Sequence, residues 1–154
     1  MNEAVVAGSI AVAALNLLPA LSGLFAFWRA DTSGPAARAF WLLLRVGQGA
    51  SLALAIAVGS LAAAGNYSTE HLFYLYALLP LAIAFLAEQL RVASAQTVLD
   101  QRGLESSAAV ASLPEGEQHQ LVSQIMRREL GVMTASAVVV VFLALRAAGT
   151  AHGF

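Results

Sequence analysis

The sequence has no cysteine and no lysine, and only 11% of its 154 residues are charged. Without cysteine the chain can form neither a disulfide nor a thiolate metal site, and it offers no thiol redox chemistry. Eight arginines and nine acidic residues leave a formal net charge of -1, which argues against a broadly basic surface for nucleic acid. No dinucleotide-binding, Walker, HExxH or GxSxG motif occurs, so none of these chemistries is supported.

Apolar residues make up 59% of the chain, more than a soluble domain of this size can bury. A helix that crosses the hydrocarbon core of a bilayer needs about 20 apolar residues. Four stretches meet this requirement, at residues 4–28, 39–64, 71–91 and 130–148. Alanine and leucine dominate them and period-two alternation is absent, which favours helices over strands. The sequence predicts an all-α, integral membrane, up-and-down four-helix bundle that forms one domain.

The arginines predict how the chain is oriented, because loops rich in Lys or Arg stay in the cytoplasm. The connection at 29–38 holds two arginines, and the long connection at 92–129 together with Arg91 holds four. The residues before the first stretch and the turn at 65–70 hold none, and Arg146 alone lies near the other terminus. We therefore expect a multi-pass protein of the cytoplasmic (inner) membrane with both termini outside.

The sequence of the connection at 92–129 predicts a helical hairpin. Gly103 follows a polar run and is expected to cap a helix C-terminus. Ser112 and Glu115 have the Ser-x-x-Glu spacing of a capping box, with Pro114 in the first turn of the helix that follows.

Two of the predicted helices are longer than a bilayer is thick. The third is expected to run from His71 to about Gln101, and the fourth from about Glu115 through its span. The fourth then has roughly 36 residues, or about 54 Å at 1.5 Å per residue. Helices three and four should therefore extend into the cytoplasm as an antiparallel stalk, with residues 103–112 at its tip.

Charged residues inside the spans mark a candidate site, because each costs about 2.5 to 3.5 kcal/mol at mid-span and normally faces a partner or a cavity. Arg45 and Glu88 should lie at a similar depth on antiparallel helices and can therefore meet. The full candidate ligand-binding set comprises Arg45, Gln48, Glu88, Arg91, Arg128 and Glu129. Its three arginines and two glutamates give a net charge of +1. The set can form a cytoplasmic-side pocket for an anionic headgroup or small anion, or a structural ion-pair network that fixes helix register.

Other polar and small residues in the spans allow two interpretations each. Asn16, followed by Pro19 in the first span, can line a ligand path or make an interhelical hydrogen bond beside a kink. The second span carries small residues at four-residue spacing, as Gly49, Ala53, Ala57 and as Ser51, Ala55, Gly59. These residues permit close helix approach, either within the bundle or across a homodimer seam.

His71 is the candidate cofactor ligand, with Tyr74 one turn away on the same helical face. The stretch from Gln48 to Tyr76 resembles the four-helix cytochrome b modules of the haem A synthases. Those modules hold haem between paired histidines buried in the helices, and this chain has no second histidine inside a span. The alternative is that His71 and the tyrosines belong to an interfacial aromatic belt.

The outline of four spans with external termini also resembles the membrane-bound glutathione and eicosanoid enzymes. Their second-helix signature of arginines, asparagine and glutamate is missing here. The leading hypothesis is a non-enzymatic accessory or scaffold component of the cytoplasmic membrane, in contact with the bilayer and with a second copy or a larger membrane complex, and with no nucleic acid. The alternatives are a small carrier or lipid- or anion-binding protein with a cytoplasmic-side pocket, and a haem- or quinone-binding protein.

Overall fold

The chain folds into helices. The computed structural model describes residues 2–29, 32–104 and 107–152. These ranges contain no strand, and their helices are α1 (Asn2–Trp28), α2 (Pro35–Ala63), α3 (His71–Gln101), α4 (Ser107–Ala111) and α5 (Glu115–Thr150). The prediction of an all-α chain with four long helices is confirmed.

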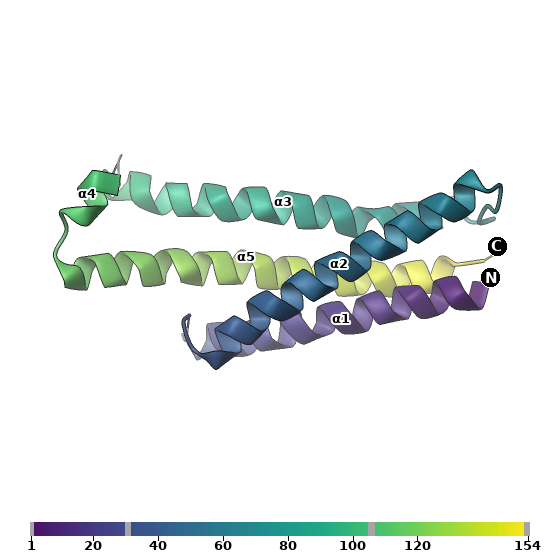
Figure 1. Ribbon diagram of the computed structural model, residues 1–154, viewed down its shortest axis with the longest axis horizontal. Coiled ribbons are helices and arrows are strands. Elements are labelled where there is room, and N and C mark those ends of the chain that lie inside the picture. The colour runs from purple at the N-terminus through teal and green to yellow at the C-terminus, as the bar shows by residue number, and fades with distance from the viewer. Residues whose placement is uncertain (1, 30–31, 105–106, 153–154) are drawn as a thin grey trace.

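The four long helices pack as an up-and-down bundle (Figure 1). α5 packs along both α1 and α3, whereas α2 lies mainly against α1 and makes fewer contacts with α3 and with α5. The two termini and the α2–α3 turn lie at one end of the molecule, which we call the termini end, and α4 lies at the other, which we call the stalk end. α2 is therefore held to the bundle chiefly through α1.

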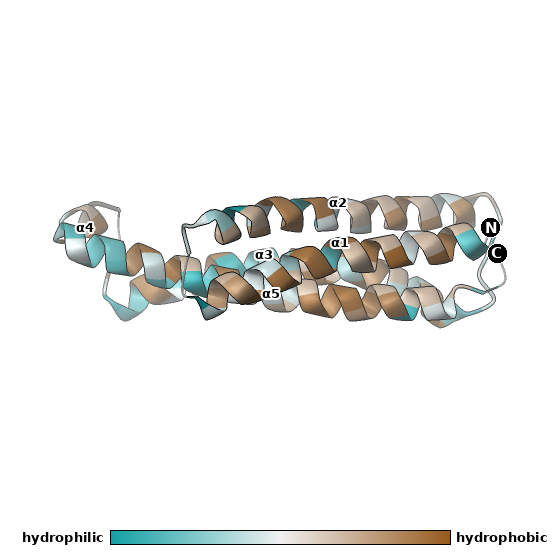
Figure 2. Ribbon diagram, turned by 90° about the horizontal axis from the view of Figure 1, so that it is seen from below, coloured by the Kyte–Doolittle hydropathy of each residue, from teal (hydrophilic) through white to brown (hydrophobic). Residues whose placement is uncertain are grey.

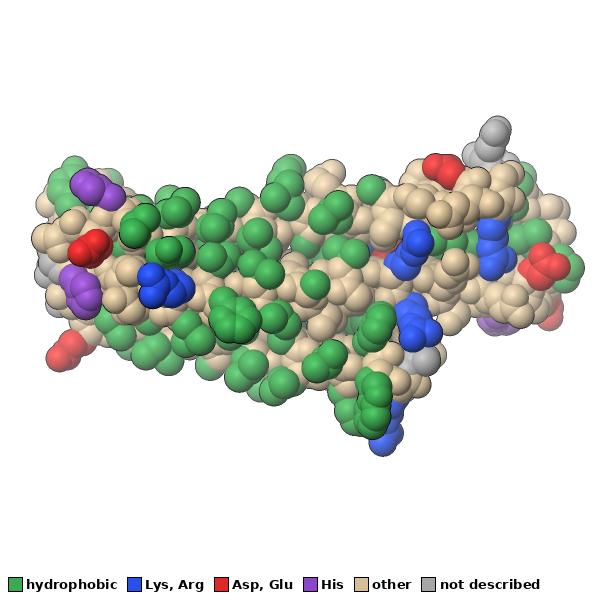
Figure 3. Space-filling model, turned by 180° about the vertical axis from the view of Figure 1, so that it is seen from behind, with side chains coloured by type: hydrophobic (Ala, Val, Ile, Leu, Met, Phe, Trp, Pro, Cys, Tyr) green, Lys and Arg blue, Asp and Glu red, His purple; other side chains and the backbone are tan. Residues whose placement is uncertain are grey.

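The bundle exposes apolar side chains in the way that a lipid-facing protein does. α1, α2, α3 and α5 are each long and apolar enough to cross a membrane, and at most 39% of the residues in any of their apolar windows are buried. Hydrophobic residues follow the length of the bundle (Figure 2), and the face in Figure 3 has a middle band without Arg, Asp, Glu or His side chains. The chain is a polytopic membrane protein whose spans contact the lipid bilayer.

α3 and α5 continue past the ends of α1 and α2 at the stalk end (Figure 1). They have 31 and 36 residues, or about 46 and 54 Å at 1.5 Å per residue. The overhang, which we call the stalk, has a small apolar core of its own around Val98, Leu104 and Leu121. The predicted helix lengths are confirmed, while the cytoplasmic placement of the stalk stays a prediction.

The predicted helix ends at the stalk tip are right in one case and wrong in the other. Gly103 has a φ of +67°, the left-handed conformation of a glycine that follows a helix, as expected. The capping box at Ser112 is wrong, because the Ser112 hydroxyl donates to Ala109 O at 2.7 Å and α5 begins without a side-chain cap. Ser112 instead follows the short helix α4, which the sequence did not predict.

Close packing within the bundle depends on a glycine of α1. Gly23 is buried where α1, α2 and α5 meet, and a Cβ atom added there would lie 2.7 Å from the ring of Phe40 and would collide with the Thr134 hydroxyl. α1 approaches both neighbours closely because Gly23 has no side chain.

Candidate functional site

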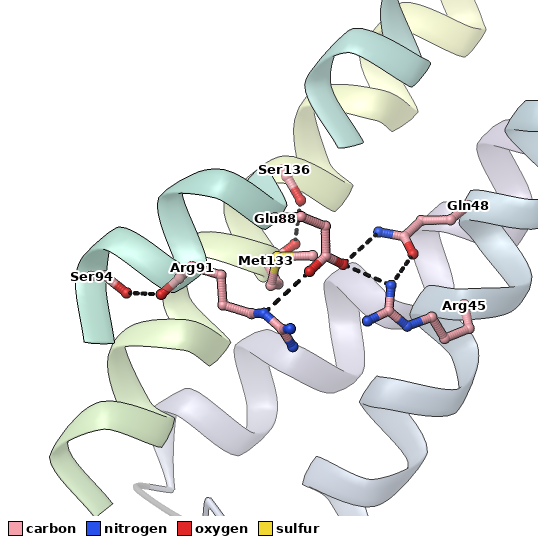
Figure 4. Close-up of polar contacts among 7 residues, drawn as sticks. All are labelled: Arg45, Gln48, Glu88, Arg91, Ser94, Met133 and Ser136. Atoms are coloured by element: carbon pink, nitrogen blue, oxygen red, sulfur yellow. Dashed lines mark hydrogen bonds and ion pairs between the residues drawn. The ribbon is translucent and has the colours of Figure 1, made fainter. Parts of the chain in front are cut away.

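A glutamate of α3 lies between two arginines (Figure 4). Glu88 Oε1 accepts a hydrogen bond from Arg45 Nη1 at 2.7 Å, and Glu88 Oε2 lies 3.2 Å from Arg91 Nε. The second contact is an ion pair without hydrogen-bond geometry. Gln48 accepts from Arg45 Nη1 at 2.7 Å and donates to Glu88 Oε1 at 3.5 Å. We call Arg45, Gln48, Glu88 and Arg91 the Glu88 cluster.

Helix geometry explains why Arg45 and Glu88 meet. Arg45 lies ten residues after the start of α2 at the stalk end, or about 15 Å along the helix. Glu88 lies 17 residues after the start of α3 at the termini end, or about 25 Å. The bundle is about 40 Å long between these two ends, the length of the 27 residues of α1. A point about 15 Å from one end is therefore about 25 Å from the other, and the two side chains lie at the same depth. The predicted meeting of Arg45 and Glu88 is confirmed.

An aromatic ring adds a second link between α2 and α3. The guanidinium carbon of Arg91 lies 5.5 Å from the centroid of the Trp41 ring, a cation–π distance. Trp41 in turn packs edge-on against the buried ring of Phe40, with 5.1 Å between centroids. The sequence prediction missed Trp41, although its position one turn before Arg45 on α2 was a usable signal.

The Glu88 cluster is partly exposed and carries surplus positive charge. The side chains of Arg45, Glu88 and Arg91 are 53%, 26% and 29% exposed. Two guanidinium groups share one carboxylate, so the cluster has a net charge of +1. This arrangement can clamp α3 to α2, and its surplus charge can attract an anion.

Arg128 and Glu129 were predicted to join this group, but no hydrogen bond or ion pair within the described ranges connects either to the Glu88 cluster. The α5 residues drawn beside Glu88 are Met133 and Ser136 (Figure 4). Glu129 lies one helical turn, about 6 Å, further toward the stalk end than Met133. The structure thus unites four of the six candidate residues.

Asn16 makes an interhelical hydrogen bond in the middle of α1. Its side chain is 2% exposed, and Nδ2 donates to Val12 O at 2.9 Å and to Gly47 O of α2 at 3.2 Å. Ser51 Oγ also donates to Gly47 O, at 3.0 Å. These contacts match the packing interpretation of Asn16.

The two predicted stripes of small residues on α2 differ in their surroundings. Gly49, Ala53 and Ala57 of the first stripe are exposed, whereas Ser51 and Ala55 of the second are buried and its last member, Gly59, is exposed. The closest approach of α2 to α1 is at Gly47, which the prediction missed: a Cβ atom there would lie 2.7 Å from Asn16 Oδ1. The spacing Gly47-x-x-x-Ser51 was the signal for this contact.

His71 and Tyr74 lie at the termini end, where α3 begins. His71 is exposed, and the Tyr74 hydroxyl accepts a hydrogen bond from Ser68 N at 2.8 Å. Ser68 Oγ donates to His152 O at 2.8 Å, so this turn is tied to the C-terminal segment. The described ranges hold no group of three His, Cys, Asp or Glu side chains suited to a metal ion.

A search with this chain finds no matching protein family, no matching curated protein and no matching solved structure. Any inference of function must therefore start from the chemistry of the residues themselves. Among the candidate sites predicted from the sequence, the Glu88 cluster is the one whose charged side chains contact one another directly.

Proposed function

We propose that this chain is a non-enzymatic accessory or scaffold protein of the cytoplasmic membrane that associates through α2 with a partner helix or a second copy of itself. The observation that supports this best is the exposure of Arg45. Its side chain is 53% exposed on a helix apolar enough to span the membrane.

A guanidinium group that faces lipid below the headgroups is energetically costly, by about 2.5 to 3.5 kcal/mol at mid-span. The pairing with Glu88 lowers this cost for one edge of the Arg45 guanidinium only. A helix packed over the α2–α3 side would remove the remaining exposure to lipid.

The outward surface of α2 is suited to such a contact. Leu42, Leu52 and Ile56 are 68%, 49% and 61% exposed and offer apolar area. Between them Gly49 has no atom within 4 Å of an added Cβ, so another backbone can approach closely. In this proposal, Gly49 and its neighbours at four-residue spacing form the seam.

The same proposal places the stalk in the cytoplasm, on the basis of the arginine distribution. The stalk carries Arg102, Arg127 and Arg128, whereas the termini end of α5 carries Arg146 alone. A rigid projection of two paired helices gives an accessory protein a second surface for a partner in the cytoplasm.

The absence of cysteine makes the α2 contact directly testable. Gly49→Cys should yield a disulfide-linked homodimer, or a cross-link to another protein, when native membranes are oxidised. Phe142→Cys is the matched control, because Phe142 is 65% exposed on α5 and outside the proposed seam. The measurement is the fraction of cross-linked chain on a non-reducing gel.

Equal cross-linking of the two variants would indicate random collision in the membrane and would contradict the proposed seam. Native mass spectrometry after gentle extraction provides an independent test. A monomer without any bound protein, together with unlinked Gly49→Cys, would reject the scaffold function.

A second candidate function is supported by the charge of the Glu88 cluster. Because its two guanidinium groups share one carboxylate, the cluster can bind an anion or an anionic headgroup, as expected for a small carrier or lipid-binding protein. In that case Arg45→Gln should weaken anion binding more than it lowers thermal stability. Loss of stability without any change in binding would assign the cluster to structure alone.

A further inference from the structure

A groove outside the Glu88 cluster lies at the stalk end of α1. It has a volume of about 580 Å³ and is lined by five apolar side chains of α1 and one cation of α5: Leu21, Leu24, Phe25, Phe27, Trp28 and Arg127. Leu24 is 60% exposed and Trp28 is 81% exposed. The spacing from Leu21 to Leu24 to Trp28 places these three residues on one face of α1. The groove is therefore an open apolar channel with a charge at its edge.

Two arginines make cation–π contacts with aromatic rings that line the groove. The Arg127 guanidinium carbon lies 5.1 Å from the centroid of the Phe27 ring, and that of Arg29 lies 4.6 Å from the centroid of the Phe25 ring. Hydrophobic and basic side chains lie next to each other toward the stalk end in Figure 3. A cation–π contact leaves other N–H groups of a guanidinium able to donate hydrogen bonds.

Neither of these arginines has an ion-pair partner in the part of the chain that the structure describes. By contrast, Arg45 and Arg91 share Glu88. A planar fork of N–H donors matches the oxygens of a phosphate group. The groove thus combines a guanidinium group at its edge, that of Arg127, with an apolar channel.

We propose that this groove binds an anionic phospholipid. Its phosphate contacts Arg127, and one acyl chain lies along Leu24 and Leu21. Tryptophan and arginine at the end of a spanning helix mark the level of the headgroups. Leu21 lies seven residues from Trp28, about 10 Å deeper along α1, so the channel runs in the direction that an acyl chain takes. This inference is independent of the α2 contact and of the anion site proposed above.

The test compares two lipids that differ in headgroup charge and share their acyl chains. Dioleoylphosphatidylglycerol and dioleoylphosphatidylcholine are titrated into the full-length protein in detergent, and bound lipid is counted by native mass spectrometry. Both lipids offer a phosphate to the guanidinium, but the choline of the second lipid neutralises that charge and is repelled by the arginine. We therefore expect the anionic lipid to bind about tenfold more tightly. Arg127→Gln should remove most of that preference.

Arg146→Gln is the matched control. Arg146 also makes a cation–π contact, with its guanidinium carbon 5.5 Å from the centroid of the Tyr76 ring, but it lies near the termini end of α5. Its replacement should leave the lipid preference unchanged. Helical content and melting temperature are measured for each variant, and the comparison of the two lipids on the unmodified protein decides the matter if Arg127→Gln does not fold.

Equal affinity of the unmodified protein for the two lipids would overturn the proposal. So would a preference that survives Arg127→Gln, or one that Arg146→Gln lowers to the same extent. Leu24→Asn tests the channel, because it should weaken the binding of both lipids equally. Unchanged binding of both lipids would show that the acyl chain does not lie along Leu24.

Discussion

The contacts that α2 makes with α1 and with α3 are of different kinds. Against α1, buried small residues and one buried amide bring the backbones together, as at Gly47 and Asn16. Against α3, a partly exposed ion pair and a cation–π contact bridge a wider separation, through Arg45, Glu88 and Arg91.

The two kinds of contact should therefore differ in how much they stabilise the bundle and in how open they are to a partner. Apolar surface gives little drive for helix association in lipid, so close packing and buried hydrogen bonds hold a membrane bundle together. Interhelical polar contacts in membranes contribute only about 0.6 kcal/mol on average. We therefore expect the contacts of α1 with α2 and α5 to hold the fold, and the α2–α3 contact to tolerate change and to be open to a partner.

The largest effect should come from Gly23→Ala. The added methyl group would contact the Phe40 ring at 2.7 Å and collide with Thr134, which forces α1 away from two helices. Overpacking of this kind costs about 1 to 3 kcal/mol. The measurement is the free energy of unfolding in mixed micelles.

The control for this change is Gly59→Ala on α2, outside the proposed seam, where an added Cβ meets no atom within 4 Å. Alanine is a better helix former than glycine by about 1 kcal/mol, so this variant should be as stable as the parent or slightly more stable. A loss of stability in the control similar to that of Gly23→Ala would contradict the assignment of tight packing to one side of α2.

The sequence predicts the fold well because its main determinant is local. Apolar runs of about 20 residues and a helical overhang can be counted directly, and α3 and α5 have the expected lengths. The capping box at Ser112 was wrong for a local reason too: a serine can donate to a carbonyl behind it as readily as it can cap the next helix. Sequence spacing does not decide between these two bonds.

The sequence predicts the depth of each candidate residue in the bundle, and only the part of the site that depends on depth could be predicted. Counting residues along antiparallel helices brings Arg45 level with Glu88, and the two meet. Depth does not determine rotation about the helix axis, so it could not exclude Arg128 and Glu129 or find Trp41. The same limit applies to α2, where the choice between Gly47 and Gly49 as the contact glycine depends on how α2 is rotated against α1.

Asn16→Ala should have a smaller effect than Gly23→Ala. It removes the hydrogen bond to Gly47 O but leaves room rather than a collision. Interhelical hydrogen bonds in membranes contribute about 0.6 kcal/mol on average and at most about 1.7, so we expect a loss of about 1 kcal/mol in the same unfolding assay. Ser51→Ala is the comparison. It removes the 3.0 Å bond to Gly47 O within α2 and the longer bond, 3.5 Å, that Ser51 Oγ accepts from Asn16 Nδ2, but it leaves the bond from Asn16 to Gly47 O. A larger loss for Ser51→Ala than for Asn16→Ala would show that the amide is not the link between the helices.

Glu88→Gln should have the smallest effect on stability. It keeps the shape of the side chain and removes the charge shared by Arg45 and Arg91. Interhelical polar contacts in membranes contribute about 0.6 kcal/mol on average, so we expect the free energy of unfolding to change by less than about 1 kcal/mol. The charge of the cluster rises from +1 to +2 at the same time, so binding of anionic lipid or partner protein should change more than stability does. A loss as large as that of Gly23→Ala would mean that α2 depends on α3 as much as on α1.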